Sequence, residues 1–251
     1  MRRAPLASLA AALAACLFLS SCGLLYIIGL RPTSPAKAPG SSSGDGTIAV
    51  KNVSPGTILD YFSEIAIGSE YGESAEIICK WTKRIRYCVE GDATDADREL
   101  LERLCERLNE IDGFPGISEA LISSTANMTV SFVSRDEIEQ MFENADQNCA
   151  GMASYEWENG EIISARCAID RDLTTERECT ICEDFLQSLG PARDSYMFPN
   201  SVFYQGFTIT PFPIDLDFAV LEILYSPALP AGTPRLEAMS AAATLVKWTQ
   251  E

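Results

Sequence analysis

Acidic and amide side chains at helical spacing stand out in the second half of the chain. Glu183 and Gln187 lie four residues apart, so a helix would carry them on one face, with Asp184 beside the first of them. Gly190 and Arg193 follow shortly after. A carboxylate can bind a metal ion, whereas a glutamine carbonyl is a poor ligand and an arginine is a permanent cation. Taken alone, the pattern is more typical of the solvated flank of a helix than of a site.

The composition excludes several kinds of site. The 251 residues contain no histidine, which removes the commonest general base and the commonest metal ligand. The 36 acidic and 19 basic residues give a formal charge of −17, which repels phosphate backbones and anionic lipid headgroups. We therefore expect neither a nucleic-acid partner nor serine catalysis. Carboxylate-pair chemistry stays open, although no spacing singles out a pair.

The segment from Glu183 to Arg193 resembles the zinc signature of the metzincin proteases, H-E-x-x-H-x-x-G-x-x-H. In that signature three histidines bind zinc, and the glutamate polarises the zinc-bound water. The three ligand positions here hold Glu183, Gln187 and Arg193, the general-base position holds Asp184, and the glycine is Gly190. The resemblance implies a degenerate site with no metal and no cofactor. We expect Glu183 and Arg193 to pair across it, with Gln187 hydrogen-bonded to one of them.

Residues further along extend this resemblance. Matrixin-type proteases carry a Ser-x-Met-Tyr turn beneath the metal and then an acidic helix that ends in Leu-Tyr. This chain has Ser201, Phe203 and Tyr204 in the turn, followed by the run from Asp215 to Tyr225. The chain is also similar to an uncharacterised family of bacterial exported proteins, a domain of unknown function (DUF2927), which keeps the same replaced positions. The resemblance covers roughly residues 77–228.

Hydrophobic periodicity predicts the elements that position these residues. With 47% hydrophobic residues the chain is long enough and apolar enough to bury a core. Alternation predicts strands at 84–89 and 127–133 and a hairpin at 151–169 that turns at Asn159-Gly160. Helical spacing predicts helices at 97–111, about 175–190, 215–225 and 233–248, and Thr175 with Glu178 predicts a capping box. We expect an α+β, zincin-like (metzincin-type) fold with a mixed sheet and packed helices, whose active-site helix is 175–190.

The N-terminal segment predicts export. Arg2 and Arg3 precede an apolar run, so residues 1–30 resemble a signal peptide, and Leu19-Ser20-Ser21-Cys22 resembles a lipobox with Cys22 as the lipidated residue. The alternative is a single N-terminal transmembrane anchor. Residues 31–49 form a tether rich in Pro, Gly and Ser, and 50–251 form the domain. Both alternatives predict an envelope protein that faces the periplasm and meets the membrane only through its N-terminus.

Cysteine usage agrees with an oxidising compartment. Seven cysteines follow Cys22, which predicts two or three disulfides of unknown connectivity. A redox role for Cys179-x-x-Cys182 is disfavoured because both would lie in mid-helix, and no second pair supports a zinc site.

Three functions stay open. The first is a non-catalytic module that binds an extended peptide or an envelope protein in the former substrate cleft through the edge strand. The second is a metalloprotease-like hydrolase with an unconventional site built from Glu183, Asp184 and Cys179 or Cys182. The third is a structural envelope lipoprotein, which predicts a filled groove and a covered edge strand.

Overall fold

The computed structural model describes residues 42–43, 47–68 and 76–248, and Gly40–Glu251 form one compact unit. The predicted signal peptide, its Cys22 and residues 31–41 of the predicted tether lie outside the described residues. Within the described ranges, no helix is long and apolar enough to cross a membrane.

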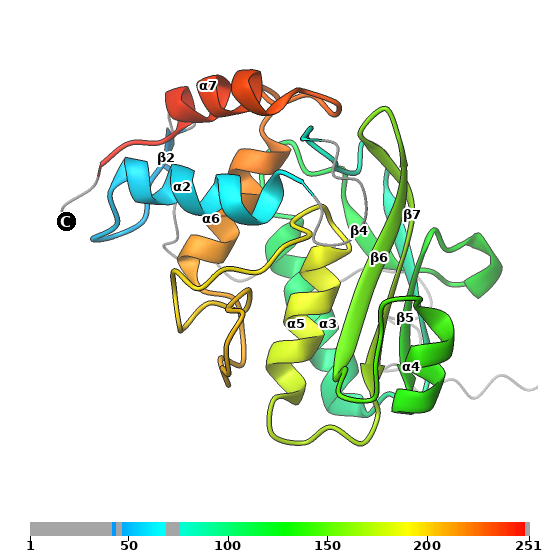
Figure 1. Cartoon of the computed structure of the whole chain (residues 1–251). Helices are drawn as coiled ribbons and strands as arrows, with labels where there is room; N and C mark the ends of the chain where they lie inside the picture. Colours follow the sequence, from blue (N-terminus) through cyan, green and yellow to red (C-terminus); the bar gives the residue numbers. More distant parts are fainter. Residues whose placement is uncertain (1–41, 44–46, 69–75, 249–251) are drawn as a thin grey trace, which may run out of the picture. The chain divides into compact units, whose positions relative to one another are not determined.

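A five-stranded sheet forms the centre of this unit (Figure 1). Its strands run in the order β4-β3-β5-β7-β6, and β4, β3, β5 and β7 are parallel to one another. β6 is antiparallel to β7 and forms one edge of the sheet. The strands are β3 (Ile85–Gly91), β4 (Ile117–Glu119), β5 (Met128–Val133), β6 (Gly151–Glu158) and β7 (Glu161–Asp170). A small sheet joins β1 (Ser42–Ser43) to β2 (Thr47–Ile48).

Helices cover both faces of the sheet. α3 (Asp95–Leu108) and α5 (Arg177–Gln187) lie side by side on one face, and the short α4 (Arg135–Met141) lies on the other (Figure 1). β7 shows how the sequence achieves this, because Cys167 and Ile169 belong to the main core on the α5 side, whereas Ala168 packs with Ile138 of α4. The prediction of an α+β fold with a mixed sheet is confirmed.

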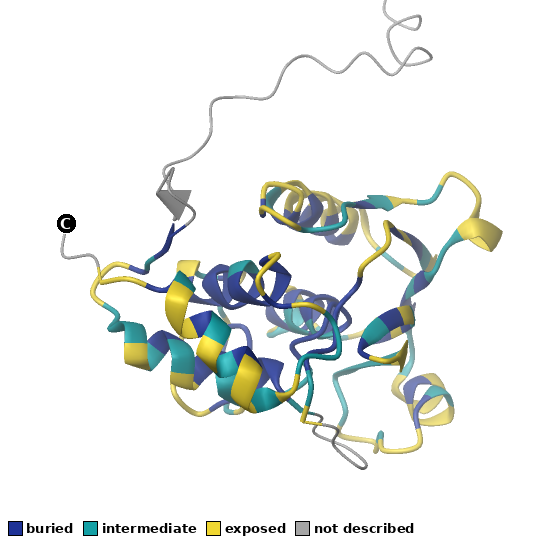
Figure 2. Ribbon diagram, turned by 90° about the horizontal axis from the view of Figure 1, so that it is seen from above, coloured by how far each residue is buried: buried dark blue, intermediate teal, exposed yellow. Residues whose placement is uncertain are grey.

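A second group of helices packs beside the sheet. α6 (Asp215–Tyr225) is buried almost all round, and α2 (Pro55–Ala66) packs against both α6 and α7 (Arg235–Leu245). Buried residues concentrate on the inward sides of the helices, with exposed residues outside (Figure 2). A 3₁₀ turn, η1 (Ser123–Thr125), precedes β5. The predicted strands and the helix at 215–225 are confirmed, and Asn159 (φ 53°) and Gly160 (φ 83°) make the predicted hairpin turn.

Three details of the prediction are wrong. The capping box of Thr175 and Glu178 does not form, because α5 begins at Arg177 and no side chain caps it. Instead, Arg177 holds this end of α5 by donating to the carboxylate of Asp97 on α3, with both N–O distances 2.8 Å. The last helix ends at Leu245 rather than near residue 248. Helices α2 and α4 and strand β4 were not predicted.

The predicted disulfides are also wrong. The seven described cysteines are all free, and six of them are buried. Cys88, Cys105 and Cys167 lie on β3, α3 and β7, and Cys179 and Cys182 share α5; a buried thiol packs there as a small apolar side chain. The cysteines are Cys79, Cys88, Cys105, Cys149, Cys167, Cys179 and Cys182.

Candidate functional site

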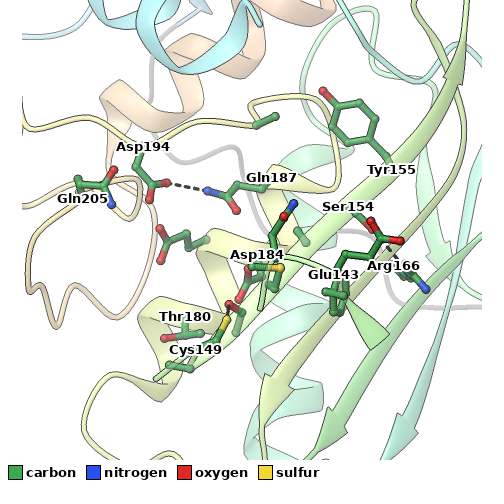
Figure 3. A pocket seen from close by; sticks show the side chains of 18 of the residues that line it. Glu143, Cys149, Ser154, Tyr155, Arg166, Thr180, Asp184, Gln187, Asp194 and Gln205 are labelled. Carbon is green, nitrogen blue, oxygen red and sulfur yellow. Dashed lines mark hydrogen bonds between the residues drawn. The ribbon is translucent and has the colours of Figure 1, made fainter. Parts of the chain in front are cut away.

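A pocket of about 760 Å³ lies between β6, helix α5 and the segments that follow α5 (Figure 3). Helix α5 contributes Thr180, Glu183, Asp184 and Gln187. Their spacing of three and four residues puts these side chains on one face of the helix, as the sequence predicted for Glu183 and Gln187. The predicted helix face therefore lines a real cavity.

Asp194 comes from the segment after α5 and meets this helix face. The side-chain amide of Gln187 donates a hydrogen bond of 2.7 Å to Oδ1 of Asp194 (Figure 3). The carboxyl of Glu183 is also hydrogen-bonded to that of Asp194. Burial raises the pKa of Asp194, while the bonds from Glu183 and Gln187 oppose the rise. A hydrogen bond between two carboxyl groups needs a proton on one of them, so this contact favours a protonated carboxyl in the pair.

Asp184 lies deeper in the pocket wall. Its side chain is only 4% exposed, and no hydrogen-bond donor among the described residues meets its carboxylate. Burial, with the nearby charge of Asp194, raises its pKa well above the ordinary value. The carboxylate lies against the backbone of β6, since a Cβ on Gly151 would be only 2.0 Å from Oδ2 of Asp184. Glycine at position 151 makes room for this acid.

The turn after α5 is held by aromatic side chains from distant segments. Gly190 has φ +128°, and a Cβ there would lie 2.4 Å from a backbone carbonyl oxygen. The indole of Trp81 donates to the carbonyl of Ser188 at 3.0 Å, and the hydroxyl of Tyr225 donates to that of Leu189 at 2.7 Å. These bonds satisfy carbonyls at the end of the helix and fix the direction of the chain that leads to Asp194.

The predicted turn at 201–204 is anchored by a buried acid. Ser201 donates a 2.6 Å hydrogen bond to Asp217 of α6, and Tyr61 of α2 bonds to both Ser201 (2.5 Å) and Asp217 (3.2 Å). Ser201 and Asp217 are fully buried. Burial raises the pKa of Asp217 to about 6, against the opposing effect of its hydrogen bonds. The network joins two helices to the turn.

The same turn also supports the segment that carries Asp194. Phe203 is fully buried, and its carbonyl accepts from the backbone N–H of Ser195 at 2.9 Å. Tyr204 forms a β-bridge with Ser195, and Gln205 reaches the pocket. The turn therefore lies next to the site without placing Ser201, Phe203 or Tyr204 in it.

The backbone of β6 forms the opposite wall. Gly151, Ala153, Tyr155 and neighbouring residues of β6 line the pocket. The N–H of Asp170 donates to the carbonyl of Ala150 at 2.8 Å, which makes these two residues a hydrogen-bonded pair of the antiparallel ladder. Because bonded and non-bonded pairs alternate, the backbone polar groups of Gly151, Ala153 and Tyr155 point away from β7, toward the pocket.

Arg193 does not take the predicted position. It is absent from the pocket lining, and no ion pair within the described ranges joins it to Glu183. Its backbone N–H bonds to the carbonyl of Ile65. The chain after Gly190 returns to the helix one residue later than predicted, at Asp194.

The thiols proposed for an unconventional metal site lie elsewhere. Cys179 and Cys182 are buried in the core, and neither lines the pocket. Burial raises the pKa of Cys179 to about 12, with smaller contributions from nearby acids. In the described part of the chain, no three acidic or thiol side chains lie in an arrangement that could hold a metal ion.

Comparison with known families identifies the domain. A family described as a protein of unknown function (DUF2927) matches residues 55–244. The chain belongs to the DUF2927 family. This match supports the resemblance to the family of unknown function that was seen in the sequence. It does not support the resemblance to the metzincins. No curated protein matches the chain.

In this DUF2927 domain, sequence reasoning found Glu183, Asp184 and Gln187 but missed Asp194 and Gly151. Asp194 was adjacent to a residue already chosen, and its acidity was a usable signal. Gly151 carried no signal, because the need for glycine comes from Asp184, which is distant in sequence.

Proposed function

We propose that this domain is a non-catalytic, zincin-like binding module that holds an extended segment of a peptide or protein partner along β6. The observation that carries the proposal is that, among the described residues, no strand pairs with the outer edge of β6, which lines an open pocket of about 760 Å³. A purely structural lipoprotein would have no use for such a groove.

The backbone supplies the binding mode. An edge strand presents free N–H and C=O groups, and an added strand satisfies them by extending the sheet. Ala153 and Tyr155 would offer both groups to the partner, and Gly151 would offer its N–H, because its carbonyl already accepts a hydrogen bond from the thiol of Cys149 at 2.9 Å. Alternate side chains of the partner would then point toward α5 and determine selectivity.

The zincin-like part of the proposal rests on the arrangement of elements. A helix below the antiparallel edge strand carries the pocket residues Glu183 and Gln187, and it ends at a turn around Gly190. The buried turn at Ser201 and helix α6 then follow in the predicted order. We propose that this frame has kept its shape with an acid and an amide in place of metal ligands.

The edge strand can be tested directly. We would select binders from a random peptide library with the full chain, then measure their affinities for two variants by fluorescence anisotropy. Ala153→Pro removes one free N–H at the edge and should weaken binding about tenfold or more. Ala153→Val keeps that N–H at similar side-chain volume and should bind within about threefold of the parent. Failure to select any peptide, or equal affinity for the two variants, would refute the proposal.

We further propose that the domain is exported and held at the cell envelope through a lipid on Cys22. The supporting pattern is Leu19-Ser20-Ser21-Cys22 after a basic and apolar start. Labelling cells with a radioactive fatty acid should mark the parent protein but not Cys22→Ala. Equal labelling of both would exclude lipidation at this residue.

A further inference from the structure

Basic side chains are scarce among the described residues of the pocket. Arg166 is the only lysine or arginine among the described residues that line the pocket. Its guanidinium is already engaged, because it donates to Ser154 at 3.2 Å and stacks over the ring of Phe142 at 4.8 Å. Figure 3 shows Arg166 on the side of the pocket away from Asp184 and Asp194.

Asp184 is the strongest sign of a missing partner. Asp184 is only 4% exposed, and a carboxyl group on so buried a residue normally has a donor or a counter-charge, but no described residue supplies one to its carboxylate. The side chain faces the pocket, so a ligand can reach it (Figure 3).

The edge strand and Asp184 are aligned with each other. Asp184 occupies the space where a Cβ of Gly151 would be. Consider the residue of an added strand that lies directly opposite Gly151. Its Cβ would be on the same face of the sheet as Asp184, about 5 Å from the position that a Cβ of residue 151 would take. Its side chain would therefore point at the acids of α5.

We infer that the partner segment presents a cationic side chain, lysine or arginine, to Asp184 and to the pair formed by Glu183 and Asp194. This inference rests on the proposed function, because the added strand delivers the cation. An ammonium or guanidinium group has several donors, which suits one unpartnered carboxylate and a neighbouring pair of carboxyls.

Proton release should accompany binding. The raised pKa values of Asp184 and Asp194 have the same leading cause, burial, and a bound cation would lower both. The other titratable groups around Asp184 are Glu183 and three thiols that stay protonated near neutral pH: those of Cys149, Cys167 and Cys179. The protons released would thus come from the carboxyl groups.

The test uses matched peptides on the full chain. Three blocked peptides of alternating valine and threonine would carry lysine, norleucine or glutamate at one central position. We expect the lysine peptide to bind at least about tenfold more tightly than the norleucine peptide, and the glutamate peptide to bind most weakly. Calorimetry in two buffers of different ionisation enthalpy should show protons released with lysine and none with norleucine.

Two variants locate the effect. Asp184→Asn should reduce the preference for lysine over norleucine to about threefold or less. Glu178→Gln removes the same charge from an exposed position of the same helix and should leave the preference unchanged. Equal reduction by both variants would show a long-range charge effect and overturn the inference.

The outcomes separate the inference from the proposed function. If lysine and norleucine peptides bind equally, the edge strand binds peptides but the cation preference is refuted. If no peptide binds, the proposed function fails, and butylguanidinium alone then serves as the probe. Proton release with butylguanidinium in the parent but not in Asp184→Asn would support a cation site, and its absence would refute it.

Discussion

The side-chain amide of Gln187 donates a 2.7 Å hydrogen bond to the carboxylate of Asp194. This contact joins helix α5 to the segment beyond Gly190 and closes one side of the pocket. It also explains why Glu183 and Asp194 can lie together, because the amide offsets part of the cost of burying Asp194. Side-chain hydrogen bonds between α5 and Asp194 therefore hold the frame around the pocket.

Substitution of Gly151 should be costly. A Cβ at this position would lie 2.0 Å from Oδ2 of Asp184 and 2.6 Å from Cγ2 of Thr180. We expect Gly151→Ala to lower the free energy of unfolding by about 1–3 kcal/mol in urea titrations. Gly56→Ala on helix α2 is the control, because its nearest neighbouring atom is 3.9 Å away, and it should stabilise by about 0.5–1 kcal/mol. Equal effects of the two changes would contradict this packing.

Asp184 should make the fold less stable as pH rises. Its pKa is raised in the folded state, chiefly by burial, so above about pH 4 the unfolded chain ionises first and binds fewer protons. Stability contributed by protonated Asp184 is thus present at low pH and lost on the way to neutrality. Asp184→Asn should be more stable than the parent by about 1 kcal/mol or more at pH 7, with a smaller difference at pH 4. A less stable variant at pH 7 would argue against this environment.

The sequence predicted the elements that follow clear periodicity. The hairpin was predictable because Asn159-Gly160 favours a tight turn, and α6 was predictable from its apolar run. The short strand β4 and helix α4 carry too few periods to be detected. The capping box at Thr175 failed because a tertiary bond from Arg177 decides where α5 begins.

The site was predictable only on the helix. Spacing on one helix face is a local property, so Glu183 and Gln187 could be placed together from sequence. Whether Arg193 or Asp194 returns to that face depends on the path of the turn, which Trp81 and other distant residues determine. The disulfide prediction failed for a similar reason, since cysteine number indicates a compartment and does not report which thiols meet.

Lysine should not replace Arg177 without a loss of stability. Arg177 donates to both carboxylate oxygens of Asp97. Burial alone would raise the pKa of Asp97, but the hydrogen bonds from Arg177 and Thr94 outweigh burial and lower it. The stability from this pair is present above about pH 4 and is lost as pH falls through the lowered pKa. Arg177→Lys cannot make both bonds and should cost about 1–3 kcal/mol at pH 7 and less below pH 4.

An exposed pair between helix α3 and strand β4 provides the control for this change. Arg98 contacts Glu119 at 3.2 Å, and both side chains are about half exposed. Arg98→Lys should therefore change the free energy of unfolding by less than about 0.5 kcal/mol. A similar loss in both variants would show that the contact between Arg177 and Asp97 stabilises the fold no more than an exposed ion pair does.

The described thiols should all be titratable without a reducing agent. In denaturant, iodoacetamide should add one group to each of the seven, and mass spectrometry of the peptides would locate them. In the folded protein, the half-buried Cys149 should react first, although slowly, because burial raises its pKa to about 11. The melting temperature should be the same with and without a reductant. Peptides linked by a disulfide in unreduced protein would contradict the arrangement of the core.

Ser201 should matter more at neutral pH than in acid. It donates to Asp217 at 2.6 Å, and Asp217 has its pKa raised to about 6, chiefly by burial. Below about pH 4 the acid is protonated in both the folded and the unfolded chain, whereas at pH 7 it is ionised and needs its donors. Ser201→Ala should therefore cost about 2–3 kcal/mol at pH 7 and about 1 kcal/mol at pH 4.

Two comparisons would isolate the role of Asp217 in that result. Ser164→Ala changes an exposed hydroxyl that donates to Glu156 at the surface, so it should have little effect at either pH. Tyr61→Phe removes the hydroxyl that contacts Ser201 at 2.5 Å and Asp217 at 3.2 Å. Because its bond to Asp217 is the longer of the two bonds that this acid accepts from side-chain hydroxyls, it should show the same pH trend as Ser201→Ala with a smaller amplitude. If the cost of Ser201→Ala were independent of pH, the hydroxyl would act through packing alone, and the link between α2, the turn and α6 would not depend on the charge of Asp217.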